Sequence, residues 1–140
     1  QINQQEDDMP HIQFEINRSL SDNEKIPFAE EVRQLFSEIM DTGTEHICIS
    51  IREFGTHNLS IGRATDPASG VAVVNADIRQ GRTMKQRRML SLGFMNLMEK
   101  YWRIQRNQMY VTLTEHKGED FHLVEKFLAD WQEGEDPLAD

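Results

Sequence analysis

The dipeptide Met9-Pro10 stands directly before a segment of alternating apolar residues, 11–16. Proline is an unusual residue at the start of a strand, because it has no backbone N–H to give to the ladder. If Met9 is the initiator and is removed, Pro10 becomes the first residue and carries a free secondary amine. Such an amine in a dry pocket can be neutral at pH 7 and accept a proton. If other residues precede Pro10, its nitrogen is an amide and cannot act as a base.

Nine residues stand ahead of Pro10 in the chain, and codons for Glu6-Asp7 can contain GAGGA, a ribosome-binding sequence. We therefore expect residues 1–9 to be an extension, either upstream sequence read through or a cloning remnant. Residues 10–131 are the expected domain, and residues 132–140 are an acidic tail. The two end segments carry three and four acidic residues and no basic ones, so they account for seven of the nine net negative charges.

Composition excludes several classes of partner. The domain itself is close to neutral and lacks a general basic surface, so no nucleic-acid partner is expected. No apolar run reaches the length of a membrane span and no signal peptide opens the chain, which favours a cytoplasmic protein without a membrane partner.

Cys48 is the single cysteine, so no internal disulfide can form. The five histidines lack metal-ligand spacing on any one element, and neither a metal nor another cofactor is expected.

Hydrophobic periodicity predicts the same order of elements twice: strand, helix, strand. In each unit a capping box opens the helix, Ser21–Glu24 in the first and Thr83–Gln86 in the second. Pro27 in the first helix suggests a delayed or kinked start, and Gly43 is the expected left-handed cap at its end. The predicted strands are 12–16, 47–51, a short 58–61, 71–78 and 109–113; the predicted helices run from the capping boxes to about Met40 and Trp102.

Two βαβ units predict an α/β (α+β) fold with one four-stranded mixed sheet and both helices on one face. A third helix is expected from Glu119 to about Trp131, with Phe121, Val124, Phe127, Leu128 and Trp131 on its apolar side. Helices on one face leave the other face of the sheet uncovered. Such a face needs a partner, so self-association is expected.

Three motifs resemble one known family. The segment 78–87, with Gly81-Arg82-Thr83 between strand and helix, resembles the same turn in muconate isomerases and 4-oxalocrotonate tautomerases. Residues 107–112 are similar to the segment of the migration inhibitory factors that carries a pocket tyrosine. Residues 51–62 resemble a strand and glycine-ended hairpin of the 4-oxalocrotonate tautomerases. With the Met-Pro start and the two βαβ units, about residues 10–115 resemble the tautomerase superfamily, nearest to its 5-carboxymethyl-2-hydroxymuconate isomerase and 4-oxalocrotonate tautomerase branches.

The resemblance implies a homotrimer with pockets at subunit boundaries and a small carboxylate substrate. In the family an N-terminal proline moves a proton between carbons of an enol or keto acid, and arginines bind the substrate carboxylate. The carried-over catalytic residues are Pro10 as the base and Tyr110 as a donor to the enolate oxygen. The arginine in the family's Gly-Arg-Ser/Thr motif corresponds to Arg82, while the strand arginine of 4-oxalocrotonate tautomerase corresponds to Cys48 here.

Each candidate residue also has a plain structural interpretation. Arg82 can bind a carboxylate with its guanidinium and the free N–H groups of the helix start, or it can be a solvated arginine in a turn. Arg52 can close the pocket as an anion binder or pair with an acid across a trimer. Arg79 extends the basic cluster that includes Arg82 and is a further candidate for substrate binding. Tyr110 can polarise the substrate or simply be a half-buried strand tyrosine.

Two functions remain open at this point. One is a tautomerase or isomerase of small unsaturated keto or hydroxy carboxylic acids, with Pro10 as general base. The other is a non-catalytic trimeric binding or structural module of the same fold, in which the proline is blocked. The chain is an enzyme in the first case only, and the difference depends on whether Pro10 is the mature N-terminus.

Overall fold

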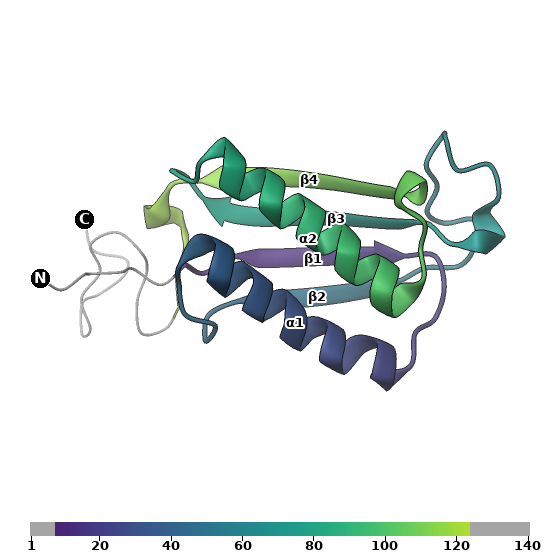
Figure 1. The fold of residues 1–140 in the computed structure, drawn as a ribbon, viewed down its shortest axis with the longest axis horizontal. Coiled ribbons are helices and arrows are strands. Elements are labelled where there is room, and N and C mark those ends of the chain that lie inside the picture. Colours follow the sequence, from purple (N-terminus) through teal and green to yellow (C-terminus); the bar gives the residue numbers. More distant parts are fainter. Residues whose placement is uncertain (1–7, 124–140) are drawn as a thin grey trace, which may run out of the picture.

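A computed structural model describes residues 8–123, and its elements follow the two predicted units (Figure 1). The first unit comprises β1 (His11–Ile16), α1 (Asp22–Met40) and β2 (Cys48–Glu53). The second comprises β3 (Ala72–Arg79), α2 (Met84–Trp102) and β4 (Met109–His116). Short 3-10 turns cover Pro67–Ser69, Arg106–Gln108 and Gly118–Asp120.

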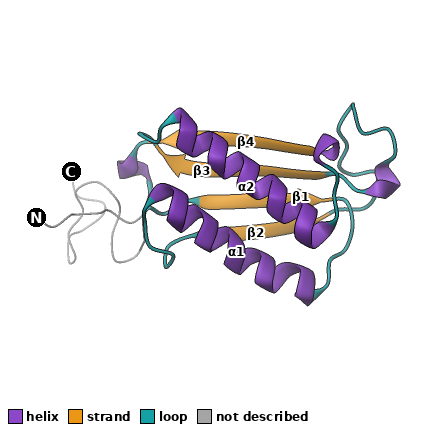
Figure 2. Ribbon diagram, viewed as in Figure 1, coloured by secondary structure: helices purple, strands orange, loops and turns teal. Residues whose placement is uncertain are grey.

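The four strands form one mixed sheet in the order β2-β1-β3-β4. Within each unit the strands are parallel, and β1 runs antiparallel to β3, which joins the units. Both helices lie on the same face of the sheet, α1 on the side of β2 and α2 on the side of β4 (Figure 2). The predicted sheet and its helical layer are therefore confirmed.

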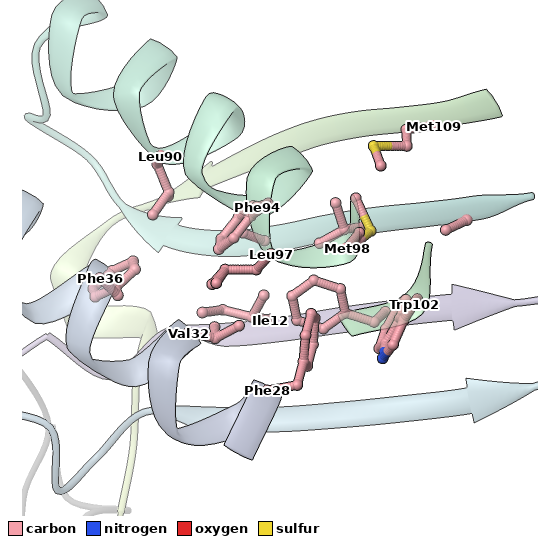
Figure 3. Packing of buried hydrophobic residues seen from close by; sticks show 14 of the residues in the cluster. Ile12, Phe28, Val32, Phe36, Leu90, Phe94, Leu97, Met98, Trp102 and Met109 are labelled. Carbon is pink, nitrogen blue, oxygen red and sulfur yellow. The ribbon is translucent and has the colours of Figure 1, made fainter. Parts of the chain in front are cut away.

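The core lies between this sheet and the two helices (Figure 3). Alternate residues of the central strand β1 point into it, and Ile12, Phe14 and Ile16 are fully buried. The rings of Phe28 and Trp102 stack with centroids 4.2 Å apart, and Phe14 packs edge-on against both. Edge-to-face and offset ring pairs add to the stability gained from apolar burial.

Both predicted capping boxes are present. At α1 the Glu24 N–H donates to the Ser21 hydroxyl and the Ser21 N–H donates to the Glu24 carboxylate, at 3.3 and 2.9 Å. Thr83 and Gln86 make the reciprocal pair at α2. Each box satisfies two N–H groups that a helix start leaves without partners. α1 begins at Asp22, so Pro27 lies inside the helix and does not delay its start.

Two local predictions in the first unit are wrong. The left-handed cap of α1 is Asp41, with φ of 54°, and not Gly43. An aspartate tolerates this conformation better than most residues. No strand forms at residues 58–61, where the Asn58 N–H instead bonds to the Gly55 carbonyl at 2.9 Å and closes a turn.

The third helix does not begin at Glu119. Gly118–Asp120 is a single 3-10 turn, and residues 121–123 are not helical. Phe121 instead packs edge-on against His116, with ring centroids 5.5 Å apart. The remainder of the predicted helix, 124–131, lies outside the described residues.

The face of the sheet opposite the helices is mainly polar. The Asp77 carboxylate accepts a hydrogen bond from the Gln13 amide at 2.8 Å and lies 2.8 Å from the His116 ring nitrogen. Arg52 contacts Gln13 and Glu15 at 3.2 and 3.4 Å. A partner on this face would meet a hydrogen-bonded network and not the apolar surface that the uncovered sheet suggests.

Glu53 links the end of β2 to the start of α1 and should contribute stability that depends on pH. Its carboxylate accepts from the Leu20 N–H at 2.9 Å and lies 3.2 Å from the Lys25 ammonium. The Leu20 bond, opposed by partial burial and supported by Lys25, lowers the pKa of Glu53 below 4.5. A lowered folded-state pKa gives stability that is present above the unfolded pKa and is lost as pH falls.

We therefore expect Glu53→Gln to reduce the loss of thermal stability between about pH 5 and about pH 3. The measurement is the melting temperature at closely spaced pH values. Glu30→Gln, on the exposed side of α1, is the matched control and should keep the wild-type profile. Equal profiles for wild type and Glu53→Gln would show that this contact contributes nothing.

Candidate active site

Pro10 lies at the start of the central strand and is buried. Its carbonyl accepts the Cys48 N–H at 3.0 Å, directly before the first ladder pair, His11 with Cys48. The missing N–H of proline therefore costs no sheet hydrogen bond, because pairing begins with the next residue. This position explains how a proline can precede a strand that is paired on both sides.

The two residues before Pro10 are packed against the domain. Asp8 is 1% exposed and Met9 is 7% exposed. The Asp8 N–H donates to the Thr42 hydroxyl at 2.7 Å, which ties this segment to the loop after α1. In this form of the chain the nitrogen of Pro10 is an amide.

Arg82 reaches the same place from the turn between β3 and α2. Gly81 has φ of 102°, a conformation that favours glycine, and it redirects the chain from the strand to the capping residue Thr83. The Arg82 guanidinium forms an ion pair with the Asp8 carboxylate and donates to the Met40 carbonyl at 3.3 Å. Arg82 is thus not a solvated turn residue: its side chain is 16% exposed and already binds a carboxylate.

Two further details define this end of the site. At the start of α2, the Gln86 N–H donates to the Thr83 hydroxyl in the capping box. The carboxylate of Asp8 is bound by the Arg82 guanidinium. Arg79, the last residue of β3, is level with His116 of β4 and projects from the same side of β3 as Asp77. Pro10, Arg79 and Arg82 therefore occupy one end of the sheet.

Arg52 and Tyr110 lie at the other end. Arg52 is paired in register with Glu15 and contacts its carboxylate at 3.4 Å. Tyr110 is 56% exposed and level with Val73, which itself pairs with Glu15. Glu15 lies five residue steps along the chain from Pro10, which corresponds to about 17 Å in a strand. One chain does not bring Arg52 or Tyr110 to Pro10.

Sequence reasoning missed two contacts at this end of the sheet. The Asp8–Arg82 pair joins residues 74 apart, and residue 8 had been assigned to the extension. The Asp77–His116 pair was missed because the last strand was expected to end at Leu113. The sequence did offer one indication of the Asp77–His116 pair. Strand alternation assigns Asp77 to the side of β3 that faces away from the helices.

Within residues 8–123, no three His, Cys, Asp or Glu side chains gather as metal ligands would. In the same part of the chain, no helix combines the length and apolarity needed to cross a membrane.

Comparison with solved structures identifies the fold. The chain superposes on the fused 4-OT wild type asymmetric trimer with a TM-score of 0.72 at 15% identity, covering 84% of this chain and 94% of that one. The fold is that of the tautomerases and migration inhibitory factors. Pt0534 inactivated by 2-oxo-3-pentynoate gives a TM-score of 0.73 at 13% identity, with the same coverage. The macrophage migration inhibitory factor-like protein of Entamoeba histolytica gives 0.69 at 16% identity, covering 86% and 99%.

In sequence, the chain matches no protein-family model and no curated protein. The similarity to tautomerases and migration inhibitory factors is therefore one of fold. It agrees with the resemblance noted from the Met-Pro start and the Gly81-Arg82-Thr83 turn.

Proposed function

We propose that the form of this protein that begins at Pro10 is a tautomerase or isomerase of small unsaturated keto or hydroxy carboxylic acids. The observation that carries the proposal is the Asp8–Arg82 ion pair. It supports a site in which a carboxylate binds to Arg82 beside the position of the Pro10 nitrogen. The structural neighbours support the same class, because one of them is a 4-OT trimer and another is inactivated by a 2-oxo acid.

In this mechanism the Pro10 amine is the general base. It accepts a proton from the carbon next to the substrate carbonyl, giving an enol or dienol, and returns the proton at another atom. Burial of the amine and the nearby positive charge of Arg82 both disfavour its protonated form, so it is available as a base at neutral pH. Arg82 holds the substrate carboxylate and thereby fixes the distance from the reacting carbon to the amine.

The other proposed residues act from different positions. Arg79, at the end of β3, assists Arg82 in binding the carboxylate. Arg52 and Tyr110 lie about 17 Å along the sheet from Pro10, so in this proposal they belong to the site of a neighbouring subunit. There Tyr110 donates a hydrogen bond to the enolate oxygen, which stabilises the charge that develops on it. The protein is accordingly proposed to be a homotrimer, and the trimers formed by two fused 4-OT neighbours support this proposal.

The second candidate is a non-catalytic trimeric module with a blocked proline. The burial of Asp8 and Met9 favours it, because a chain that retains these residues has no amine at Pro10. The two candidates differ in whether the Pro10 nitrogen is free, so a chain that begins at Pro10 tests the first candidate directly. Its fold should be preserved, since the core cluster begins at Ile12.

A chain that starts at Met9, with the methionine removed and the new N-terminus verified by mass, should ketonise phenylenolpyruvate. Pro10→Ala should reduce kcat/KM by about a hundredfold or more, which is the usual contribution of a general base. Arg82→Gln should raise KM, whereas the exposed Arg88→Gln, six residues further along, is the matched control and should not. Full activity in Pro10→Ala, or no activity with a free Pro10, would remove the proline mechanism for this substrate.

Sedimentation equilibrium tests the proposed assembly independently of activity. The expected mass is three times the 16.3 kDa of one chain. A monomeric mass would leave Arg52 and Tyr110 without access to Pro10 and would eliminate them from the site.

A further inference from the structure

The Asp8 carboxylate occupies the part of the site where the proposed substrate carboxylate would bind. It is 1% exposed and pairs with the Arg82 guanidinium, which also donates to the Met40 carbonyl at 3.3 Å. Arginine holds carboxylates through charge-assisted hydrogen bonds, and burial strengthens this attraction. A free carboxylate would therefore have to compete with Asp8 for the Arg82 guanidinium.

The segment that carries Asp8 is anchored and not loosely placed over the site. The Asp8 N–H donates to the Thr42 hydroxyl at 2.7 Å, and the next residue, Met9, is 7% exposed. Pro10 then enters the central strand. Because the backbone is fixed on both sides of the carboxylate, its effective concentration at Arg82 is high.

Among the described residues 8–123, Asp8 supplies the carboxylate paired with Arg82. Glu115, near the end of β4, instead contacts Arg87 at 3.4 Å and is 39% exposed. Arg87 also donates to the Arg82 carbonyl at 2.6 Å, so Glu115 supports the turn and leaves the Arg82 guanidinium to Asp8.

We propose that Asp8 is a built-in competitor that keeps the carboxylate subsite of Arg82 closed in every form of the chain that retains it. The identity of the displaced ligand as a small organic carboxylate rests on the proposed function. In this view residues ahead of Pro10 block the site twice: the Met9–Pro10 amide removes the base, and the Asp8 side chain fills the anion subsite. A chain that begins at Pro10 lacks both blocks.

The test measures binding of benzoate, a carboxylate that cannot tautomerise, to the full-length chain by isothermal titration calorimetry. Asp8→Ala should bind benzoate at least about tenfold more tightly than wild type, because a site that is occupied nine-tenths of the time weakens an external ligand by about that factor. Asp8→Asn, which keeps the size of the side chain, should also bind more tightly. Glu30→Gln removes the same charge on the exposed side of α1 and should bind as wild type does.

The double variant Asp8→Ala/Arg82→Gln should lose the gained affinity, which locates the benzoate at Arg82. Circular dichroism should show that each variant is folded. Equal benzoate affinity in wild type, Asp8→Ala and Asp8→Asn would overturn the proposal, as would a gain that survives Arg82→Gln. These outcomes do not depend on catalysis, so an inactive Pro10 form with an open subsite in Asp8→Ala would contradict the proposed function and leave this inference standing.

Discussion

The pairing of β1 on both sides is the constraint on which the rest of this fold depends. β1 is parallel to β2 and antiparallel to β3, and it is the strand that joins the two units. Its alternate residues Ile12, Phe14 and Ile16 are fully buried under both helices. A register shift of one residue would expose all three and bury the polar side chains between them. The start of β1, and with it Pro10, is therefore fixed in space.

The same constraint decides which groups can meet Pro10. Since β3 runs antiparallel to β1, its carboxyl end returns to the start of β1, and the turn at Gly81 then delivers Arg82 to that end. β2 runs parallel to β1, so its carboxyl end lies away from the start of β1. Arg52, near that end, therefore lies far from Pro10. A single chain thus holds Pro10 and the Asp8–Arg82 ion pair at one end of the sheet, and Arg52 and Tyr110 at the other.

Local signals were sufficient for most of the fold. The alternation in β1 and β3 and the capping boxes at Ser21 and Thr83 each depend on residues a few positions apart, and they predicted the strands and the helix starts correctly. The segment 58–61 failed because its alternation lacked a strand to pair with and its backbone closed a turn instead. Alternation without a ladder partner is not enough to form a strand.

The site was harder to predict because its contacts are long-range. Pro10 and Arg82 could be proposed from motifs, but their relation to Asp8 depends on the antiparallel return of β3 and on a turn 74 residues away. The same holds for Asp77 and His116, which meet only because β3 and β4 are in register. Residue type and spacing indicated which side chains can bind an anion, whereas the topology determines which anion they meet.

The central claim is that Pro10, when it is the first residue, is a neutral amine in a buried, cationic environment. The most direct measurement is an NMR titration of a chain that begins at ¹⁵N-labelled Pro10, compared with a Pro-His-Ile peptide. The account predicts that the pKa of the amine in the protein lies below that in the peptide, and that Arg82→Gln raises it. An amine pKa equal to or above that of the peptide would contradict the account.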